Sequence, residues 1–208
     1  MKALERSRRA LQQAFPGSIT SGRVWVARPD KWFLRGADLA PSTYGEDSIT
    51  LTPLLMALFV PTPAVNYILN FPLRAPSKEA WPRAQFASES DLIMAARDRN
   101  LPWLDSYPTP RAVAQRVTSD PTTDPYALEV AHAAMLLDGD VAEAESIIRR
   151  MTGGLGAHPP PWAPQIVARA HALQDVARES LPAAVRVMAD RRVELLEQLR
   201  LAAVAKAT

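Results

Sequence analysis

The three histidines are the side chains in this sequence best suited to acid–base or metal chemistry near neutral pH. His132 and His171 fall in two separate stretches of helical pattern, and His158 falls in a proline-rich stretch. The sequence has no HxH, HExxH or comparable ligand motif. We therefore expect neither a metal site nor a cofactor, and we expect His132 to lie on a helix face next to the core.

Nucleophilic and phosphate-binding chemistry has equally little support. The chain has no cysteine and no GxSxG turn that would expose a catalytic serine. Its serines fall at turns and helix starts, where a hydroxyl caps backbone N–H groups. The glycine cluster at 153–156 follows a helical pattern without a preceding strand, so it indicates a hinge or linker rather than a nucleotide site. We assign no catalytic residue and expect a non-enzymatic protein.

A small-ligand site is the alternative hypothesis. Phenols, amides and a guanidinium occur in and beside an apolar, alternating stretch of the first half of the chain. Such groups can orient a ligand in a crevice between a sheet and the helices packed on it. For an enzyme or small-ligand binder, the pocket residues that we expect are Tyr44, Asn66, Tyr67, Asn70 and Arg74.

Charge is unevenly distributed along the chain, although the formal net charge is only +2. Residues 1–36 carry eight basic and two acidic side chains, whereas residues 101–151 carry four basic and eight acidic ones. Either the fold presents two faces of opposite potential, or the segments neutralise one another. On the first interpretation, the residues that we expect to bind another protein are Arg6, Arg8 and Arg9.

The basic N-terminal region also supports a third hypothesis, nucleic-acid binding. Trp25, Trp32 and Phe33 lie among its cations, and basic groups beside aromatic rings bind strands through phosphate charge and base stacking. Alternating tryptophans in a hairpin are more typical of a core, and no nucleic-acid-binding motif accompanies the charge. We therefore rank this hypothesis below protein binding.

The elements that must position these residues change in period along the chain. Residues 2–15 have helical spacing, which predicts a helix that ends before Pro16. Runs rich in β-branched and aromatic residues, or alternating in polarity, then predict strands at 19–27, 31–35, 49–52 and 65–71. We expect a loop at 38–47 and a break or bulge of the third strand at Pro53.

From residue 88 onward, capping residues precede each run of helical spacing. The expected caps are Ser88 or Ser90, Thr109 before Pro110, Asp124 before Pro125, and Asp140 after Gly139. The last stretch, 165–205, predicts one long helix or two helices separated at Pro182. We also expect Trp103, which is flanked by Leu101 and Leu104, to be buried.

These patterns predict an α+β fold: an N-terminal helix and a mostly antiparallel sheet of about four strands, followed by an all-helical C-terminal half. We expect a single structural domain. Its predicted parts are a helix-plus-sheet lobe at 1–87, a helical lobe with an αα-hairpin at 88–151, a linker at 152–164 and C-terminal helices at 165–208.

Composition points to a soluble globular protein. The 208 residues are 48% hydrophobic and 22% charged, which suffices for a core, and the absence of cysteine suits a reducing compartment. We expect a cytoplasmic location, because the N-terminal stretch lacks the apolar core of a secretory signal. The uncharged stretch 48–73 is long enough to cross a bilayer, but its prolines and asparagines favour buried strands, so we expect no membrane span.

Two resemblances involve larger segments. The hairpin YALEVAHAAMLLDGDVAEAESIIRRM resembles one unit of a tetratricopeptide-type repeat, but without a second copy we expect an ordinary helix pair. The order of TPLLMALFVPTPAVNYILNFPLR, DLIMAARDRNLPWLDSYPTPRAVAQRV and ALEVAHAAMLLDGDVAEAESIIRRM, over about residues 50–151, is similar to a group of uncharacterised bacterial α+β proteins. Some of these are suspected of neutralising toxins, so the resemblance implies a protein partner and an immunity-like role.

Overall fold

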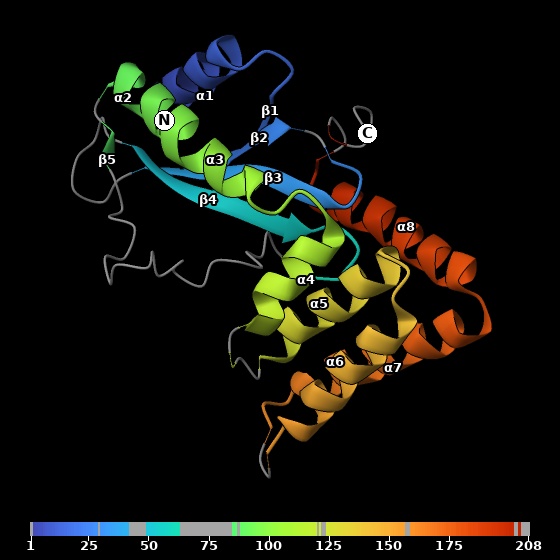
Figure 1. Cartoon of the computed structure of the whole chain (residues 1–208). Coiled ribbons are helices and arrows are strands. Elements are labelled where there is room, and N and C mark those ends of the chain that lie inside the picture. The colour runs from blue at the N-terminus through green and yellow to red at the C-terminus, as the bar shows by residue number, and fades with distance from the viewer. Residues whose placement is uncertain are drawn as a thin grey trace. The chain divides into compact units, whose positions relative to one another are not determined.

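The computed structural model divides the chain into two compact units (Figure 1). The sheet unit comprises residues 1–56, 64–106 and 196–208, and the helical unit comprises residues 57–63 and 107–195. The structure describes residues 2–28, 30–41, 49–62, 85–86, 88–119, 121, 124–156, 159–201 and 204. Within these residues, no helix is both long and apolar enough to cross a membrane.

Among the described residues, the sheet has five strands in sequential order. They are β1 (Ile19–Ser21), β2 (Val24–Arg28), β3 (Phe33–Pro41), β4 (Ile49–Ala57) and the two-residue β5 (Gln85–Phe86). The pairs β1–β2, β2–β3 and β4–β5 are antiparallel. With α1 (Lys2–Ala14) before the sheet and helices after it, this architecture confirms the predicted α+β fold.

Three strand predictions were wrong in detail. The expected strand 19–27 is split by a turn at Gly22, whose φ of +56° suits glycine, into β1 and β2. The expected loop from Asp38 begins as strand β3, where the Asp38 carboxylate accepts hydrogen bonds from Arg23. β4 continues through Pro53, so the strand does not break there. The strand predicted at 65–71 lies outside the described residues.

The core of the sheet unit forms where α1 and α2 (Glu89–Ala95) pack on the sheet. Its centre is Trp25 of β2, which is fully buried and contacts the ring of Phe15 at a centroid distance of 5.2 Å. Apolar side chains from every layer surround it: Leu11, Leu39, Ile49 and Leu92. Burial of such side chains is the main free-energy gain that holds these elements together.

The helical segment after the sheet begins as predicted and then departs from a regular α-helix. The Ser88 hydroxyl caps α2 by accepting the N–H of Asp91, at 3.1 Å. A π-helical turn, η1 (Ala96–Asn100), follows α2 and continues into α3 (Leu101–Asp105). Trp103 of α3 is only half-buried, so the expectation of a buried tryptophan was wrong; Leu104 enters the core instead.

The helical unit contains five helices among the described residues: α4 (Pro110–Ser119), α5 (Pro125–Leu137), α6 (Val141–Gly153), α7 (Ala163–Glu179) and α8 (Leu181–Gln198), whose last residues belong to the sheet unit. The predicted caps form: Thr109, Asp124 and Asp140 each accept a first-turn N–H. The predicted helical hairpin is the α5–α6 pair, which turns at Gly139 with φ of +88°. α5 contacts α4, α6 and α7 and is buried almost throughout.

The units differ from the boundaries that composition suggested. α2, η1 and α3 belong with the sheet, although the sequence pattern grouped them with the later helices. Helix also occupies the two ends of the expected linker at 152–164, since α6 extends to Gly153 and α7 begins at Ala163. The final helical stretch is divided at Ser180, just before Pro182, which is one of the two predicted alternatives.

Candidate functional site

The five residues expected to line a ligand pocket, Tyr44, Asn66, Tyr67, Asn70 and Arg74, lie outside the described residues. The small-ligand hypothesis therefore stays a prediction. Within the described ranges, no group of three or more His, Cys, Asp or Glu side chains could hold a metal ion.

The structure places Arg6, Arg8 and Arg9 on α1, where Arg8 and Arg9 share an acidic neighbour. Both donate to the carboxylate of Glu5, at 3.4 and 3.3 Å, and Arg8 also donates to the Thr20 hydroxyl at 3.3 Å. Arg6 is exposed, and the Arg9 side chain is 72% exposed. Exposed pairs of this kind contribute little stability and leave most of the guanidinium in water.

The acidic charge of residues 101–151 is largely paired inside each unit. Arg111 of α4 donates to Asp138 and Asp140 at the α5–α6 turn, which raises the pKa of its own guanidinium. Asp105 accepts from Arg28 within the sheet unit. The Arg28–Asp105 pair joins the basic segment 1–36 to the acidic segment 101–151, whereas Asp138, Asp140 and Glu129 pair with arginines of the helical unit.

Two of the aromatic rings considered for base stacking are in the core. Trp25 and Phe33 are 0% and 1% exposed, so neither offers a ring face to a strand. Trp32 is part-buried, and the Lys31 ammonium lies 4.8 Å from its ring centroid. The basic N-terminal region thus offers charge without the exposed stacking surface that the nucleic-acid hypothesis used.

A cluster of polar side chains, three of them buried and three partly buried, lies in the helical unit and was missed by sequence analysis. It consists of Tyr126, Glu129 and His132 on α5, Arg169 and Gln174 on α7, and Arg191 on α8. The α5 members are spaced three residues apart, and so project from neighbouring positions on one side of the helix. We call this set the buried polar cluster.

Glu129 and Arg169 form the charged part of the cluster. Arg169 donates through Nε and Nη2 to the two carboxylate oxygens, at 3.0 and 2.7 Å, in bidentate geometry. Glu129 is 2% exposed, whereas the Arg169 side chain is 32% exposed. Burial raises the pKa of Glu129, and the Arg169 hydrogen bonds oppose that rise. Taking this charge out of water is offset only while Arg169 is present.

His132 and Gln174 form the neutral part. The imidazole Nε2 lies 3.0 Å from Gln174 Oε1, and Gln174 Nε2 donates to the Val141 carbonyl. With the amide oxygen as acceptor, Nε2 carries the imidazole proton and Nδ1 is left without a hydrogen-bond partner in the described structure. Burial lowers the pKa of His132 to about 4, so the ring is neutral at physiological pH.

The remaining members extend the cluster on either side. Burial raises the pKa of Tyr126, with the Glu129 charge adding to the rise and the Thr62 hydroxyl opposing it. Burial also lowers the pKa of Arg191, although the nearby Glu129 carboxylate favours its charged form. The hydrogen bonds of Glu129 and His132 join α5 to α7, and the bond from Gln174 to the Val141 carbonyl joins α7 to the start of α6. The cluster therefore fixes how these three helices pack.

A second feature that the sequence did not reveal is the π-helical turn η1. Its backbone shows the π spacing at Leu101, whose N–H bonds to the Ala96 carbonyl. Asn100 is fully buried and its side-chain N–H donates to the Gly36 carbonyl of β3, at 3.1 Å. Gly36 itself needs to be glycine, since a Cβ there would lie 1.8 Å from the Trp25 carbonyl oxygen. One end of the turn is therefore attached to the sheet.

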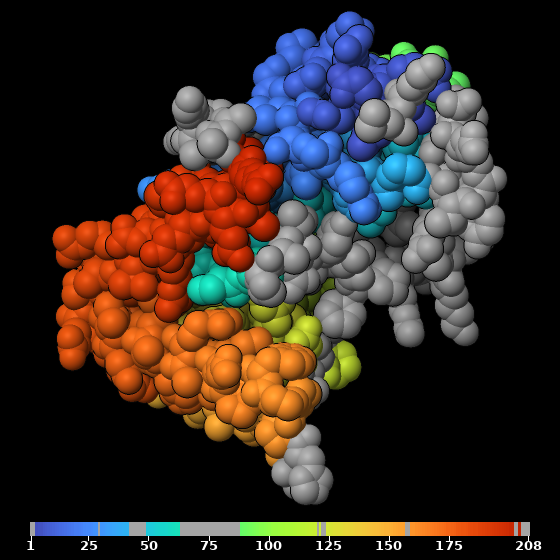
Figure 2. Space-filling model, turned by 180° about the vertical axis from the view of Figure 1, so that it is seen from behind, coloured from blue at the N-terminus to red at the C-terminus, as the bar shows by residue number. Residues whose placement is uncertain are grey.

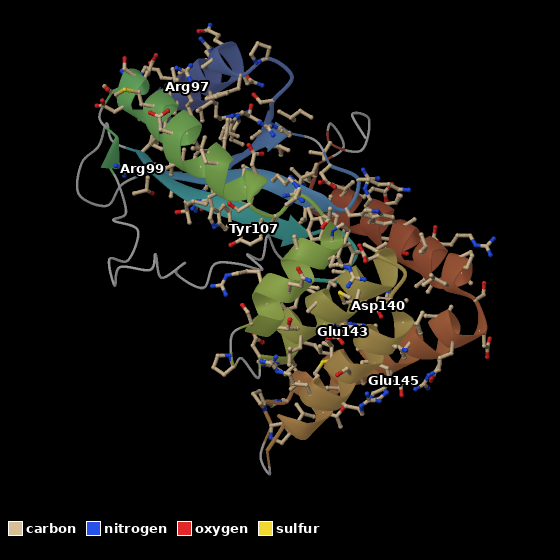
Figure 3. The ribbon with its side chains drawn as sticks, viewed as in Figure 1. Arg97, Arg99, Tyr107, Asp140, Glu143 and Glu145 are labelled. Atoms are coloured by element: carbon tan, nitrogen blue, oxygen red, sulfur yellow. The ribbon has the colours of Figure 1, made fainter. Side chains whose placement is uncertain are left out.

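The three residues before Asn100 are exposed and charged: Arg97, Asp98 and Arg99. Within the part of the chain that the structure describes, neither arginine has an ion-pair partner. Figure 3 shows the two arginines on opposite sides of the green ribbon, Arg97 toward α1 and Arg99 toward β5. Met94, one turn earlier on α2, is 51% exposed. We call Met94, Arg97 and Arg99 the basic turn.

Comparison with known proteins adds no relative. No protein-family model, curated protein or solved structure matches this chain. The functional argument therefore rests on the geometry of the basic turn and of the buried polar cluster.

Proposed function

We propose that this protein acts by binding another protein and that the basic turn is part of the surface it uses. The observation that supports this most directly is the exposure of Arg97 and Arg99 on a π-helical turn attached to the sheet by Asn100. π-Helical turns are rare and occur frequently at functional sites. Arginine and methionine are both enriched where proteins contact one another.

The attachment matters because a fixed side chain loses less conformational freedom on binding. The Asn100 amide and the buried Ala96 fix both ends of the turn, so its backbone is ordered before a partner arrives. Two arginines on either side of such a turn complement carboxylates on the partner. We therefore expect an acidic partner surface, with the exposed Arg9 of α1 adding to the same field.

The buried polar cluster favours a structural role for the helical unit. Its carboxylate is occupied by Arg169, its imidazole is fully buried, and both face other helices of the same unit. An acid–base reaction would require solvent or substrate to reach these groups. Binding through the surface requires no such opening.

An immunity-like role, in which the protein neutralises a toxin by binding it, is the specific version that we propose. Such a role requires fast association, because the toxin acts as soon as it is free, and charge steering is the usual way to achieve it. The genomic neighbours provide an inexpensive check. A toxin-like reading frame beside this one supports the role, and a place in a metabolic operon argues against it.

The direct test is kinetic. The full chain serves as bait, and association with the protein that copurifies is measured for the unaltered chain, for Arg97→Glu/Arg99→Glu and for Arg149→Glu. Arg149 is a matched control because it is exposed and lies in the other unit. We expect the double variant to slow association at low salt by about tenfold or more, with a smaller change in the dissociation rate.

The outcomes separate the hypotheses. If all three proteins associate at one rate with one salt dependence, the basic turn is not part of the interface. Binding of the unaltered chain to single-stranded DNA, lost in Arg97→Glu/Arg99→Glu, would instead support the nucleic-acid alternative. A bound small molecule released on denaturation, with no copurifying protein, would favour the pocket predicted at Tyr44 to Arg74.

A further inference from the structure

A tryptophan at the start of α7 has about half of its surface in water. Trp162 is 49% exposed and is one of three large apolar side chains with this degree of exposure among the described residues. Exposing a ring of this size forgoes the large free-energy gain that its burial would provide. Trp162 also occupies the N-cap position of α7 and makes no side-chain capping bond. Neither packing nor capping explains a tryptophan here.

The backbone around Trp162 is held in place. The Ala163 N–H donates to the Pro160 carbonyl at 2.9 Å, and the Ile166 N–H donates to the Trp162 carbonyl at 3.4 Å. Ala163 is fully buried, which attaches the turn to the helical unit. Prolines at 159, 160, 161 and 164 fix φ on both sides of the tryptophan. The ring is therefore presented on a preorganised turn.

The surroundings of Trp162 in the sequence carry no charge. Residues 151–168 include no Asp, Glu, Lys or Arg, although 22% of the whole chain is charged. Pro160, Pro161 and Pro164 are exposed beside the tryptophan. Figure 2 shows the surface of α6 and α7, the orange part of the molecule, to which this turn belongs. The exposed turn is thus apolar and proline-rich, unlike the basic turn of the sheet unit.

We propose that the turn Pro160–Trp162 docks into an uncharged groove, lined by aromatic side chains, on a partner protein. Proline rings pack on aromatic faces, and a segment with preset φ angles loses little entropy on binding. Tryptophan is the residue type most enriched among interface residues that carry large binding energy. An uncharged turn matches an uncharged groove, because a charged side chain in the groove would lose its hydration without gaining an opposite charge from the turn. This inference shares the protein partner of the proposed function but rests on a different surface.

The experiment begins with a photoreactive benzoylphenylalanine in place of Gln165, which is exposed one turn after Trp162, in the full chain. The same probe at Val193, which is 49% exposed on α8, is the control position. A protein that crosslinks to the probe at position 165 but not to the probe at position 193 is identified. It is then purified alone and titrated with the unaltered chain. Trp162→Ala is compared with Val193→Ala, a variant that also removes an exposed apolar side chain.

We expect Trp162→Ala to weaken binding by about 30-fold or more and Val193→Ala to change it by less than about threefold. The factor by which Trp162→Ala weakens binding should stay nearly constant between about 0.05 and 0.5 M salt, because this contact is uncharged, whereas the dissociation constant itself follows the salt dependence of the basic turn. Tryptophan fluorescence of the unaltered chain should shift to the blue on binding, and this shift should be lost in Trp162→Ala.

Several results would overturn the proposal. They are the absence of a position-specific crosslink, a loss of affinity in Trp162→Ala that disappears at high salt, and an affinity unaffected by Trp162→Ala. The last result would leave the proposed function in place, since binding would then run through the charged surface alone. A blue shift produced by vesicles of phosphatidylcholine and phosphatidylglycerol, with no protein adduct, would assign the turn to a lipid surface instead.

Discussion

The Arg169 guanidinium of α7 donates to both carboxylate oxygens of Glu129 on α5, and the carboxylate is almost completely buried. Arg169→Met should remove the hydrogen-bond donors that this carboxylate has among the described residues, while keeping an unbranched apolar stem at position 169. We expect it to lower the free energy of unfolding by about 3 kcal/mol, because an unpaired charge is left in the interior. Urea denaturation of the full chain at pH 7 measures the change.

Two further variants distinguish the free-energy cost of an unpaired buried charge from the cost of lost packing. Glu129→Gln/Arg169→Met should recover part of the lost stability, since no charge remains to be buried. Arg178→Met removes an exposed arginine of the same helix that pairs with Asp175 and Glu145, and it should cost less than about 1 kcal/mol. Equal losses in Arg169→Met and Arg178→Met would show that the buried pair has no special energetic role.

His132 should make the helical unit sensitive to acid. Burial lowers its pKa in the folded protein to about 4, below the ordinary value of 6.5, so the unfolded chain binds a proton at a higher pH. The stability associated with neutral His132 is therefore complete above about pH 6.5 and is lost as the pH falls toward 4. The loss should reach the order of 3 kcal/mol. Denaturation between pH 7 and 4.5, with hydrogen exchange of the α5 amides, measures it.

His132→Gln is the matched variant for this pH dependence, because it keeps a hydrogen-bonding side chain beside Gln174 and removes the titration. Glu129, whose pKa is raised, acts with the opposite sign: the folded state binds its proton more readily as the pH falls. The nearby Arg191 and His171 also disfavour a charged His132. An identical slope of stability against pH in His132→Gln and the unaltered chain would show that His132 does not contribute.

Gly36 should be one of the least replaceable residues of the sheet unit. A Cβ at this position would lie 1.8 Å from the Trp25 carbonyl oxygen and 2.8 Å from its carbonyl carbon, so two paired strands would have to move apart. Gly36→Ala should cost about 3 kcal/mol or more. Gly153→Ala is the control, because nothing lies within 4 Å of its Cβ position, and it should be neutral or slightly stabilising. A normal denaturation midpoint for Gly36→Ala would contradict the strand geometry at this point.

Local signals in the sequence predicted helix starts well because a cap depends on two or three neighbouring residues. Thr109, Asp124 and Asp140 all accept first-turn N–H groups, as their positions before proline or after glycine indicated. Strand details were less predictable, because they depend on partners far along the chain. Asp38 lies in a strand beside the neighbouring hairpin, where Arg23 binds its carboxylate, and β4 continues through Pro53.

The candidate sites were harder to predict than the fold. One signal of the buried polar cluster was present in the sequence: Glu129 and His132 lie three residues apart in an otherwise apolar helix. Their partners on α7, forty residues away, could not be read from local spacing. The π-helical turn had no local signal, since the residues after the predicted caps Ser88 and Ser90 show ordinary helical spacing. Its attachment depends on the contact between Asn100 and Gly36.

The start of α2 provides a test that separates two candidate caps, Ser88 and Ser90. The structure selects Ser88, whose hydroxyl accepts the Asp91 N–H at 3.1 Å, while Ser90 lies inside the first turn. Ser88→Ala should therefore lower the free energy of unfolding by about 1 kcal/mol, and Ser90→Ala should be nearly neutral.

The same pair of variants tests whether α2 holds the basic turn in place. Hydrogen exchange at the Asp91 amide should accelerate in Ser88→Ala and stay unchanged in Ser90→Ala, because only the first loses the acceptor of that N–H. If α2 positions η1, protection at the Leu101 amide, which closes the π turn, should also fall in Ser88→Ala. Faster exchange at Asp91 with full protection at Leu101 would mean that Asn100 and the sheet hold the turn without help from the start of the helix.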